Sequence, residues 1–196
     1  MQTTTLSFAN MHNHGELFAN MLRARRELFI VHNKWNLPEA MGMEFDQYDT
    51  PASRWIVVHD EDGRVMAGNR LTPTTAKCGI YTYMIRDAQR GLLDSIPAHL
   101  LYDEAPVSET IWESSRLFVS HEVPAHLRRR VHATLISEIA TASRALGATQ
   151  CLTLLAATWP RWSGRVGVAM SAMGPVMEIE GIDNQVVAMD FSAQLH

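Results

Sequence analysis

Four short segments of the chain place charged side chains beside bulky apolar ones. Arginine can hold a carboxylate with its planar fork of N–H groups, and an ionised carboxylate can accept a proton from a substrate amine. These residue types make the four segments the candidate functional regions. They are Arg25-x3-Phe29-x5-Trp35, residues 42–49 (GMEFDQYD), residues 70–74 (RLTPT) and residues 112–116 (WESSR).

Each segment taken alone also has an ordinary structural explanation. Arg25 and Phe29 are four residues apart, so they could be a solvated charge above a core aromatic on one helix. The acids of segment 42–49 could be plain surface acids in a loop, and Arg70 within a strand pattern would usually point to solvent. The functional interpretation therefore depends on the four segments together.

Glu113 and Arg116 are harder to explain as surface residues. If their strand is regular, residues three apart point to opposite faces. Both can meet at one site only if the strand bulges or ends there. A structural salt bridge elsewhere is the alternative that the spacing leaves open.

The hydrophobic pattern predicts the elements that position these residues. Apolar residues at helical spacing predict a helix over 16–31, capped by Asn13, and a longer helix over 125–146. Segment 36–52 has no period and is predicted as a long loop. The other expected elements are hairpins of 54–58 with 64–71 and of 176–180 with 185–191, strands over 110–120 and 150–156, and short helices over 84–93 and 159–170. This order predicts a single domain over 1–196 of α/β class (α+β type), with a mixed, mostly antiparallel sheet flanked by helices.

In this order and with this internal spacing, the four segments together resemble the acyl-homoserine lactone synthases, the autoinducer synthases of bacterial quorum sensing. Segment 83–87 (YMIRD) also fits the family. The resemblance covers about residues 16–120 and is weak from Val123 onward. It implies a fold like that of the GCN5-related acyltransferases, a bent mixed sheet with helices around it.

The resemblance also implies a reaction in two steps. The amine of S-adenosylmethionine attacks an acyl thioester, and the carboxylate then closes the lactone and expels methylthioadenosine. Glu113 would be the general base for the amine, and Asp46 would hold that amine. Arg70 and Arg116 would keep those carboxylates ionised, and could bind the substrate carboxylate.

Further residues are carried over from the resemblance as binding residues. Residues 16–52 would form a mobile substrate-binding helix and loop, in which Trp35 or Phe29 faces the sulfonium or stacks on the adenine. Leu117 stands where the family usually has phenylalanine, so the shape of the acyl pocket cannot be carried over. The expected S-adenosylmethionine-binding residues are Arg25, Phe29, Trp35 and Asp49, and the expected acyl-pocket residues are Leu117, Thr153 and Leu155.

The acyl donor is expected to be acyl carrier protein or acyl-coenzyme A. Segment 119–127 has no glycine, which favours a donor held by its pantetheine arm and protein partner over one held by its pyrophosphate. The triple arginine Arg128, Arg129 and Arg130 could dock an acidic carrier protein. A solvated helix face is the alternative explanation, and the identity of the acyl group stays open.

Composition excludes some other functions. The net charge of −4 and the pI of about 6.1 argue against nucleic-acid binding, and no spacing of cysteine or histidine indicates a metal site. Neither a signal peptide nor a bilayer-spanning stretch is evident, so we expect a cytoplasmic enzyme that binds no membrane and needs no prosthetic group. The competing interpretations are an ordinary N-acetyltransferase, which would not depend on S-adenosylmethionine, and an inactive ligand-binding domain.

Overall fold

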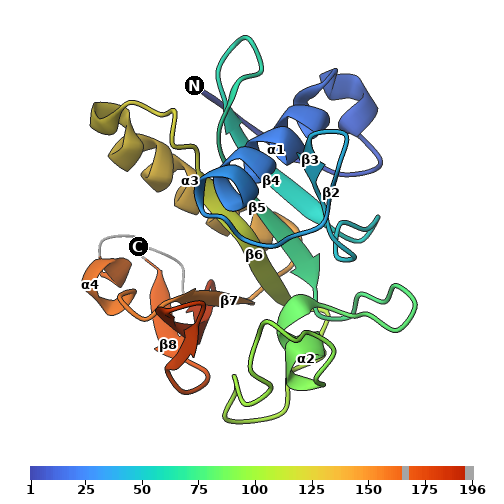
Figure 1. The fold of residues 1–196 in the computed structure, drawn as a ribbon, viewed down its shortest axis with the longest axis vertical. Coiled ribbons are helices and arrows are strands. Elements are labelled where there is room, and N and C mark those ends of the chain that lie inside the picture. Colours follow the sequence, from blue (N-terminus) through green and yellow to red (C-terminus); the bar gives the residue numbers. More distant parts are fainter. Residues whose placement is uncertain (165–167, 193–196) are drawn as a thin grey trace. The chain divides into compact units, whose positions relative to one another are not determined.

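The computed structural model describes residues 1–164 and 168–192 (Figure 1). The chain folds as two compact units. Unit 1 contains Met1–Leu71 and Arg116–Ala142, and unit 2 contains Thr72–Ser115 and the chain from Ser143 onward. The single domain expected from the sequence stays a prediction.

Unit 1 is built on antiparallel strands. Strand β4 (Arg54–His59) pairs with β1 (Gln2–Leu6) on one side and with β5 (Val65–Pro73) on the other, and β6 (Ile111–Val119) follows β5. The predicted hairpin of β4 and β5 is confirmed. Strand β1 was not predicted, because its threonine-rich sequence shows no clear apolar alternation.

The predicted N-terminal helix is confirmed within one residue at each end, but its expected cap is not. A short 3-10 helix, η1 (Met11–His14), is followed by Gly15 with a φ of 56° and then by α1 (Leu17–Arg26). Glu16 occupies the N-cap position of α1 without a side-chain bond, so the predicted capping by Asn13 is wrong. The helix continues as a π-helical turn, η2 (Glu27–His32).

Two further elements complete the frame of unit 1. The predicted long loop carries a small hairpin of β2 (Glu39–Ala40) and β3 (Met43–Glu44), which turns through Met41 and Gly42 at φ values of 53° and 75°. The predicted long helix is α3 (Ala125–Ala145). Figure 1 shows α1 and α3 on opposite faces of the strands of this unit.

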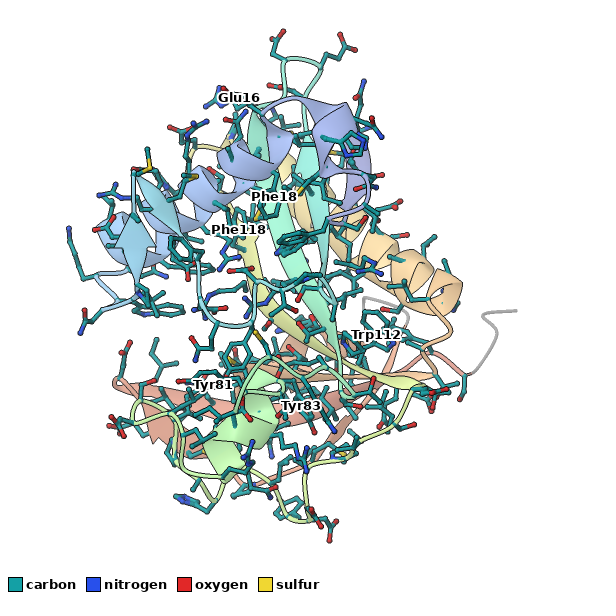
Figure 2. The ribbon with its side chains drawn as sticks, turned by 90° about the vertical axis from the view of Figure 1, so that its right-hand side faces the viewer. Glu16, Phe18, Tyr81, Tyr83, Trp112 and Phe118 are labelled. Carbon is teal, nitrogen blue, oxygen red and sulfur yellow. The ribbon has the colours of Figure 1, made fainter. Side chains whose placement is uncertain are left out.

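The core of unit 1 lies between α1 and the strands. Met21, Trp55 and Val57 are buried in this apolar cluster. Phe18 and Phe118, labelled in Figure 2, pack in the same cluster from α1 and β6. This packing fixes the face of α1 that turns toward the strands.

Unit 2 contains a parallel strand pair. Residues Ile111–Ser114 of β6 run parallel to β7 (Gln150–Ala156), and β7 is antiparallel to β10 (Ile182–Asp190). Strands β8 (Ala169–Ala172) and β9 (Met177–Ile179) both pair with β10. The predicted mixed, mostly antiparallel sheet with helices is therefore confirmed.

The helices of unit 2 are short. Helix α2 (Met84–Gln89) confirms the expected helix over 84–93 but is shorter. The helix expected over 159–170 is wrong in extent, because α4 (Pro160–Ser163) is a single turn and Ala169 already belongs to β8; residues 165–167 lie outside the described chain. No helix in the described residues is long and apolar enough to cross a membrane.

Candidate active site

Three arginines and three carboxylates of unit 1 form a closed ring of ion pairs, here called the ion-pair ring. Positive and negative groups alternate around it, and each group contacts two neighbours of opposite sign. The pairs are Arg25–Glu44 at 2.5 Å, Arg25–Asp49 at 2.8 Å, Arg70–Asp49 at 3.1 Å, Arg70–Asp46 at 2.5 Å, Arg116–Asp46 at 2.9 Å and Arg116–Glu44 at 3.1 Å. Formal charge inside the ring therefore sums to zero.

Several elements of unit 1 deliver these side chains. Helix α1 supplies Arg25, strand β3 and the loop after it supply the carboxylates, and strands β5 and β6 supply Arg70 and Arg116. The side chains are between 0% and 13% exposed, and Arg116 is the most exposed. The simpler explanations of Arg25 and Arg70 as solvated charges, and of the acids as surface acids, are therefore wrong.

The Asp46 carboxylate is held by two arginines and by its own loop. Arg70 donates to both of its oxygens, and Oδ1 also accepts the Tyr48 backbone N–H at 2.9 Å. Burial raises the pKa of Asp46, but Arg70 and Arg116 outweigh burial and hold the pKa below its ordinary value. Asp46 is therefore an anion at neutral pH.

Asp49 receives more donors than any other carboxylate of the ring. Arg25 binds it with a two-pronged contact of 2.8 and 3.0 Å, and its Oδ2 accepts the Asp46 backbone N–H at 3.0 Å. Its Oδ1 accepts the indole N–H of Trp55 at 2.9 Å. Burial raises the pKa of Asp49, and the charges of Arg70 and Arg25 lower it further than burial raises it.

Arg116 adopts an unusual backbone conformation inside strand β6. Its φ of 53° lies in the left-handed region, where a non-glycine residue is strained. The irregularity that the spacing of Glu113 and Arg116 required is thus present at Arg116. Its Nε and Nη2 bind Glu44 and Asp46, whereas its Nη1 makes no hydrogen bond with the described residues.

An aromatic group lies beside Arg116. The Arg116 guanidinium carbon is 5.8 Å from the centre of the Phe29 ring, which stacks on Trp35 at 5.1 Å and meets Phe118 edge-on. Phe29 is buried, whereas Trp35 is half-buried. Of the two predicted aromatic ligands of S-adenosylmethionine, Trp35 is the one with exposed surface.

Glu113 belongs to unit 2, where it is fully buried. One oxygen accepts the backbone N–H of Met84 at 3.2 Å and the other accepts that of Ile85 at 2.7 Å. These are first-turn donors of α2, whose N-cap residue Tyr83 provides no side-chain bond. Glu113 therefore anchors α2 to β6, a contact that the sequence did not predict.

The other predicted site residues are distributed over both units. Thr153 and Leu155 are two apart on β7, so they share a face of that strand; Thr153 is buried and Leu155 half-buried. Leu117 is half-buried in unit 1. Their role in an acyl pocket stays a prediction.

The triple arginine lies in the first turns of α3. All three residues are exposed. Arg128 donates to the backbone carbonyls of Val123 and His121, at 3.0 and 2.6 Å, and so closes the preceding loop. Arg129 and Arg130 make no side-chain hydrogen bond or ion pair with the described part of the chain, which leaves two of the three available for a partner.

Sequence reasoning missed Trp55 and gave no role to Tyr48, although Tyr48 lies within the candidate segment 42–49. Trp55 donates to Asp49, and the Tyr48 ring lies 5.6 Å from the Arg70 guanidinium carbon. Within a strand pattern, a tryptophan is equally well explained as core, and Trp55 is indeed fully buried. No group of three potential metal ligands occurs in the described residues.

A family model described as "Autoinducer synthase" matches residues 9–194. A curated acyl-homoserine-lactone synthase from Acinetobacter nosocomialis is 28% identical over 180 residues, covering 89% of this chain and 91% of that protein. Another, from Vibrio anguillarum, is 29% identical over 110 residues, covering 56% of this chain and 51% of that protein.

Solved structures share the fold. The AHL synthase LasI superposes with a TM-score of 0.78 at 21% identity, covering 98% of this chain and 90% of that one. The CoA-dependent acyl-homoserine lactone synthase BjaI, solved with SAM and isopentyl-CoA, gives 0.75 at 22% identity, covering 95% and 82%. An acyl-CoA N-acyltransferase from Pseudomonas aeruginosa gives 0.61 at 16% identity, covering 96% and 99%, so the expected likeness to acyltransferases is confirmed for the fold.

Proposed function

The chain belongs to the autoinducer synthase family, and from this premise we propose that its ion-pair ring holds the amino-acid end of S-adenosylmethionine for acylation and lactone closure. The enzyme is an acyl-homoserine-lactone synthase, an acyltransferase that makes a quorum-sensing signal. S-adenosylmethionine is its acyl acceptor and the source of methylthioadenosine. The observation that carries the proposal for the ring is the alternation of three arginines with three carboxylates, whose side chains are at most 13% exposed.

The ring suits a zwitterionic substrate. The amino-acid end of S-adenosylmethionine carries an ammonium and a carboxylate, so it needs an anion and a cation side by side. Asp46 and Arg116 are paired at 2.9 Å, and Arg116 is the member with the most exposed side chain. Asp46 would hold the amine, while Nη1 of Arg116 would bind the carboxylate.

The ring would also serve the reaction electrostatically. The ion pairs hold the charged side chains in position before the substrate binds. These side chains therefore need little reorganisation when the amine loses its proton and the thioester carbonyl develops negative charge. Lactone closure is intramolecular, so it chiefly requires that the substrate carboxylate be held near its own γ-carbon. A substrate carboxylate bound to Arg116 would be held near the γ-carbon of S-adenosylmethionine. It would leave Arg116 as it attacks that carbon.

Glu113 is the proposed general base. Its two oxygens accept one backbone N–H each, which fixes the plane of the carboxylate. An amine proton could be transferred there directly or through one water. Trp35 would cover the sulfonium or the adenine. The Phe29 ring, which stacks on Trp35, would hold the indole in place.

The acyl donor is a thioester, and acyl carrier protein and acyl-coenzyme A are both compatible with the chemistry. The exposed Arg129 and Arg130 support a protein donor with acidic side chains. The fold is shared with BjaI, which was solved with isopentyl-CoA, and this likeness supports coenzyme A as the other donor to test.

The function is tested with purified protein, S-adenosylmethionine and a panel of acyl thioesters. Methylthioadenosine and an N-acyl-homoserine lactone should appear together in equal amounts, as measured by mass spectrometry. Acetylation of other amines, with S-adenosylmethionine left untouched, would instead identify an ordinary N-acetyltransferase. Binding of S-adenosylmethionine without any product would indicate an inactive binding domain.

A further inference from the structure

We propose that Trp55 is a positioning residue of the active site, whose indole N–H fixes the Asp49 carboxylate and thereby the arginines that Asp49 holds. This inference deepens the proposed function and rests on it. Trp55 is fully buried on β4, and its Nε1 lies 2.9 Å from Oδ1 of Asp49. Trp55 therefore acts through Asp49, without touching the substrate.

The Asp49 carboxylate has no acceptor capacity left for a substrate. A carboxylate offers about four lone-pair sites on its two oxygens. Oδ1 contacts donors of Arg25, Arg70 and Trp55, and Oδ2 accepts from Arg25 and from the Asp46 backbone N–H. We therefore place Asp49 at the centre of the ring's support.

Strand register puts Trp55 where this contact is possible. Trp55 and Arg70 are direct cross-strand partners in the β4–β5 hairpin, so both side chains rise from the same face of the sheet. Asp49 receives a donor from each of them. A shift of one residue in this register would turn both donors to the other face.

The neutrality of the indole explains why a tryptophan suits this position. The ring already balances three positive against three negative charges, and a fourth cation beside Asp49 would upset that balance. An indole N–H donates a directional hydrogen bond to Asp49 and adds no charge. Its ring is also immobilised, because Phe18 packs edge-on against it at 4.8 Å and Phe8 lies at 5.8 Å (Phe18 is labelled in Figure 2).

The decisive experiment removes the N–H and keeps the shape. Trp55 is replaced by benzothienylalanine, in which sulfur takes the place of the indole N–H, and in parallel by the genetically simpler Trp55→Phe. Phe18→Leu is the matched control, because it disturbs the same apolar packing and removes no hydrogen bond of the ring. Folding is monitored by circular dichroism, binding of S-adenosylmethionine by calorimetry, and turnover by release of methylthioadenosine.

Loss of the N–H should weaken S-adenosylmethionine binding and raise its KM by about ten- to a hundredfold, the usual weight of one hydrogen bond to a charged group. The KM for the acyl thioester should stay unchanged. Phe18→Leu should lower the melting temperature at least as much as the sulfur analogue and leave both KM values alone. A merely structural tryptophan would lower kcat in proportion to the folded fraction, with no change of either KM.

Two results would overturn the inference in distinguishable ways. If the folded sulfur analogue binds and turns over S-adenosylmethionine like the unmodified enzyme, Trp55 has no positioning role although the proposed function stands. If the unmodified enzyme neither binds S-adenosylmethionine nor releases methylthioadenosine, the proposed function fails and this inference fails with it. Calorimetry separates the cases because it does not depend on turnover.

Discussion

Arg25 and Asp49, which are 24 residues apart in sequence, form a two-pronged ion pair in which Nη1 meets Oδ1 at 2.8 Å and Nη2 meets Oδ2 at 3.0 Å. The Arg25 side chain is 1% exposed and that of Asp49 is 7% exposed. Removing one partner of such a pair leaves a charge buried without compensation. The pair is therefore important for stability even if the complete ring contributes little net energy.

Asp49→Asn should destabilise the fold. The amide keeps the shape of the side chain, but it removes the charge that Arg25 and Arg70 share. The free energy of unfolding, measured in urea, should fall by about 3–5 kcal/mol. Asp62→Asn, at an exposed position, is the control and should change it by less than about 0.5 kcal/mol. Equal, small effects would show that the ring is dispensable for folding.

The ring should make stability fall in acid. The pKa values of Asp46 and Asp49 are lower in the folded protein than in the unfolded chain, so the unfolded chain binds more protons as the pH drops. Their contribution is complete above the ordinary aspartate pKa of about 4 and is lost as the pH falls toward the depressed values. Urea unfolding at pH 7, 5, 4 and 3 measures this slope. In Asp49→Asn the loss below pH 4 should be smaller, and an identical slope would assign the acid sensitivity to other groups.

Glu113→Gln tests the general base and the helix anchor together. Turnover should fall by roughly a hundred- to ten-thousandfold if Glu113 accepts the amine proton. The amide can accept only one of the two α2 N–H groups, so the unfolding free energy should also drop, by about 1–3 kcal/mol. Turnover is compared at a temperature where both proteins are folded. A folded variant with near-normal turnover would leave Glu113 only its anchoring role.

Trp35→Ala separates substrate binding from core packing. Trp35 is half-buried and covers Phe29, so truncation should weaken S-adenosylmethionine binding more than it lowers the melting temperature. Phe118→Leu, a buried change that also contacts Phe29, is the comparison expected to act mainly on stability. The interpretation of Trp35 as a core residue would be correct if stability fell strongly while the affinity did not change.

The double substitution Arg129→Glu and Arg130→Glu tests the donor. Both side chains are exposed, so the reversal should raise the apparent KM for an acyl carrier protein and leave that for S-adenosylmethionine unchanged. The effect should shrink as salt rises, because exposed charges are screened. Arg128 is left intact because it closes the loop before α3. Efficient use of acyl-coenzyme A, with no response to the reversal, would argue against carrier-protein docking.

The elements of the fold were largely predictable because their apolar periods are strong. The hairpin of β4 and β5 and the helix α3 follow directly from such periods. Strand β1 could not be predicted, because its threonine-rich sequence has no alternation of apolar and polar residues. Its pairing with β4 depends on backbone hydrogen bonds, which leave no such pattern in the sequence. The cap of α1 was predicted wrongly because Gly15 takes a positive φ and interrupts the capping pattern between Asn13 and the helix.

The residues of the candidate site were predictable, but the ion pairs and hydrogen bonds between them were not. Residue types and order indicated which charges matter, whereas nothing in the spacing showed that Arg25 and Asp49 bind each other. The contact from Trp55 depends on the register of β4 against β5, which places it opposite Arg70. Likewise, the anchoring of α2 by Glu113 arises from tertiary contact and leaves no local signature.

The alternation of the ion-pair ring restricts how these positions can change during evolution. Every member has two neighbours of opposite sign, so a single reversal creates two like-charge contacts. Exchanging one arginine with its adjacent carboxylate does not help, since each exchanged residue then meets its own sign on the outer side. Only inversion of all six at once restores the pattern. No one of the six positions can therefore change its charge alone. We expect related enzymes to differ in the residues around the ring and to keep the order of charges within it.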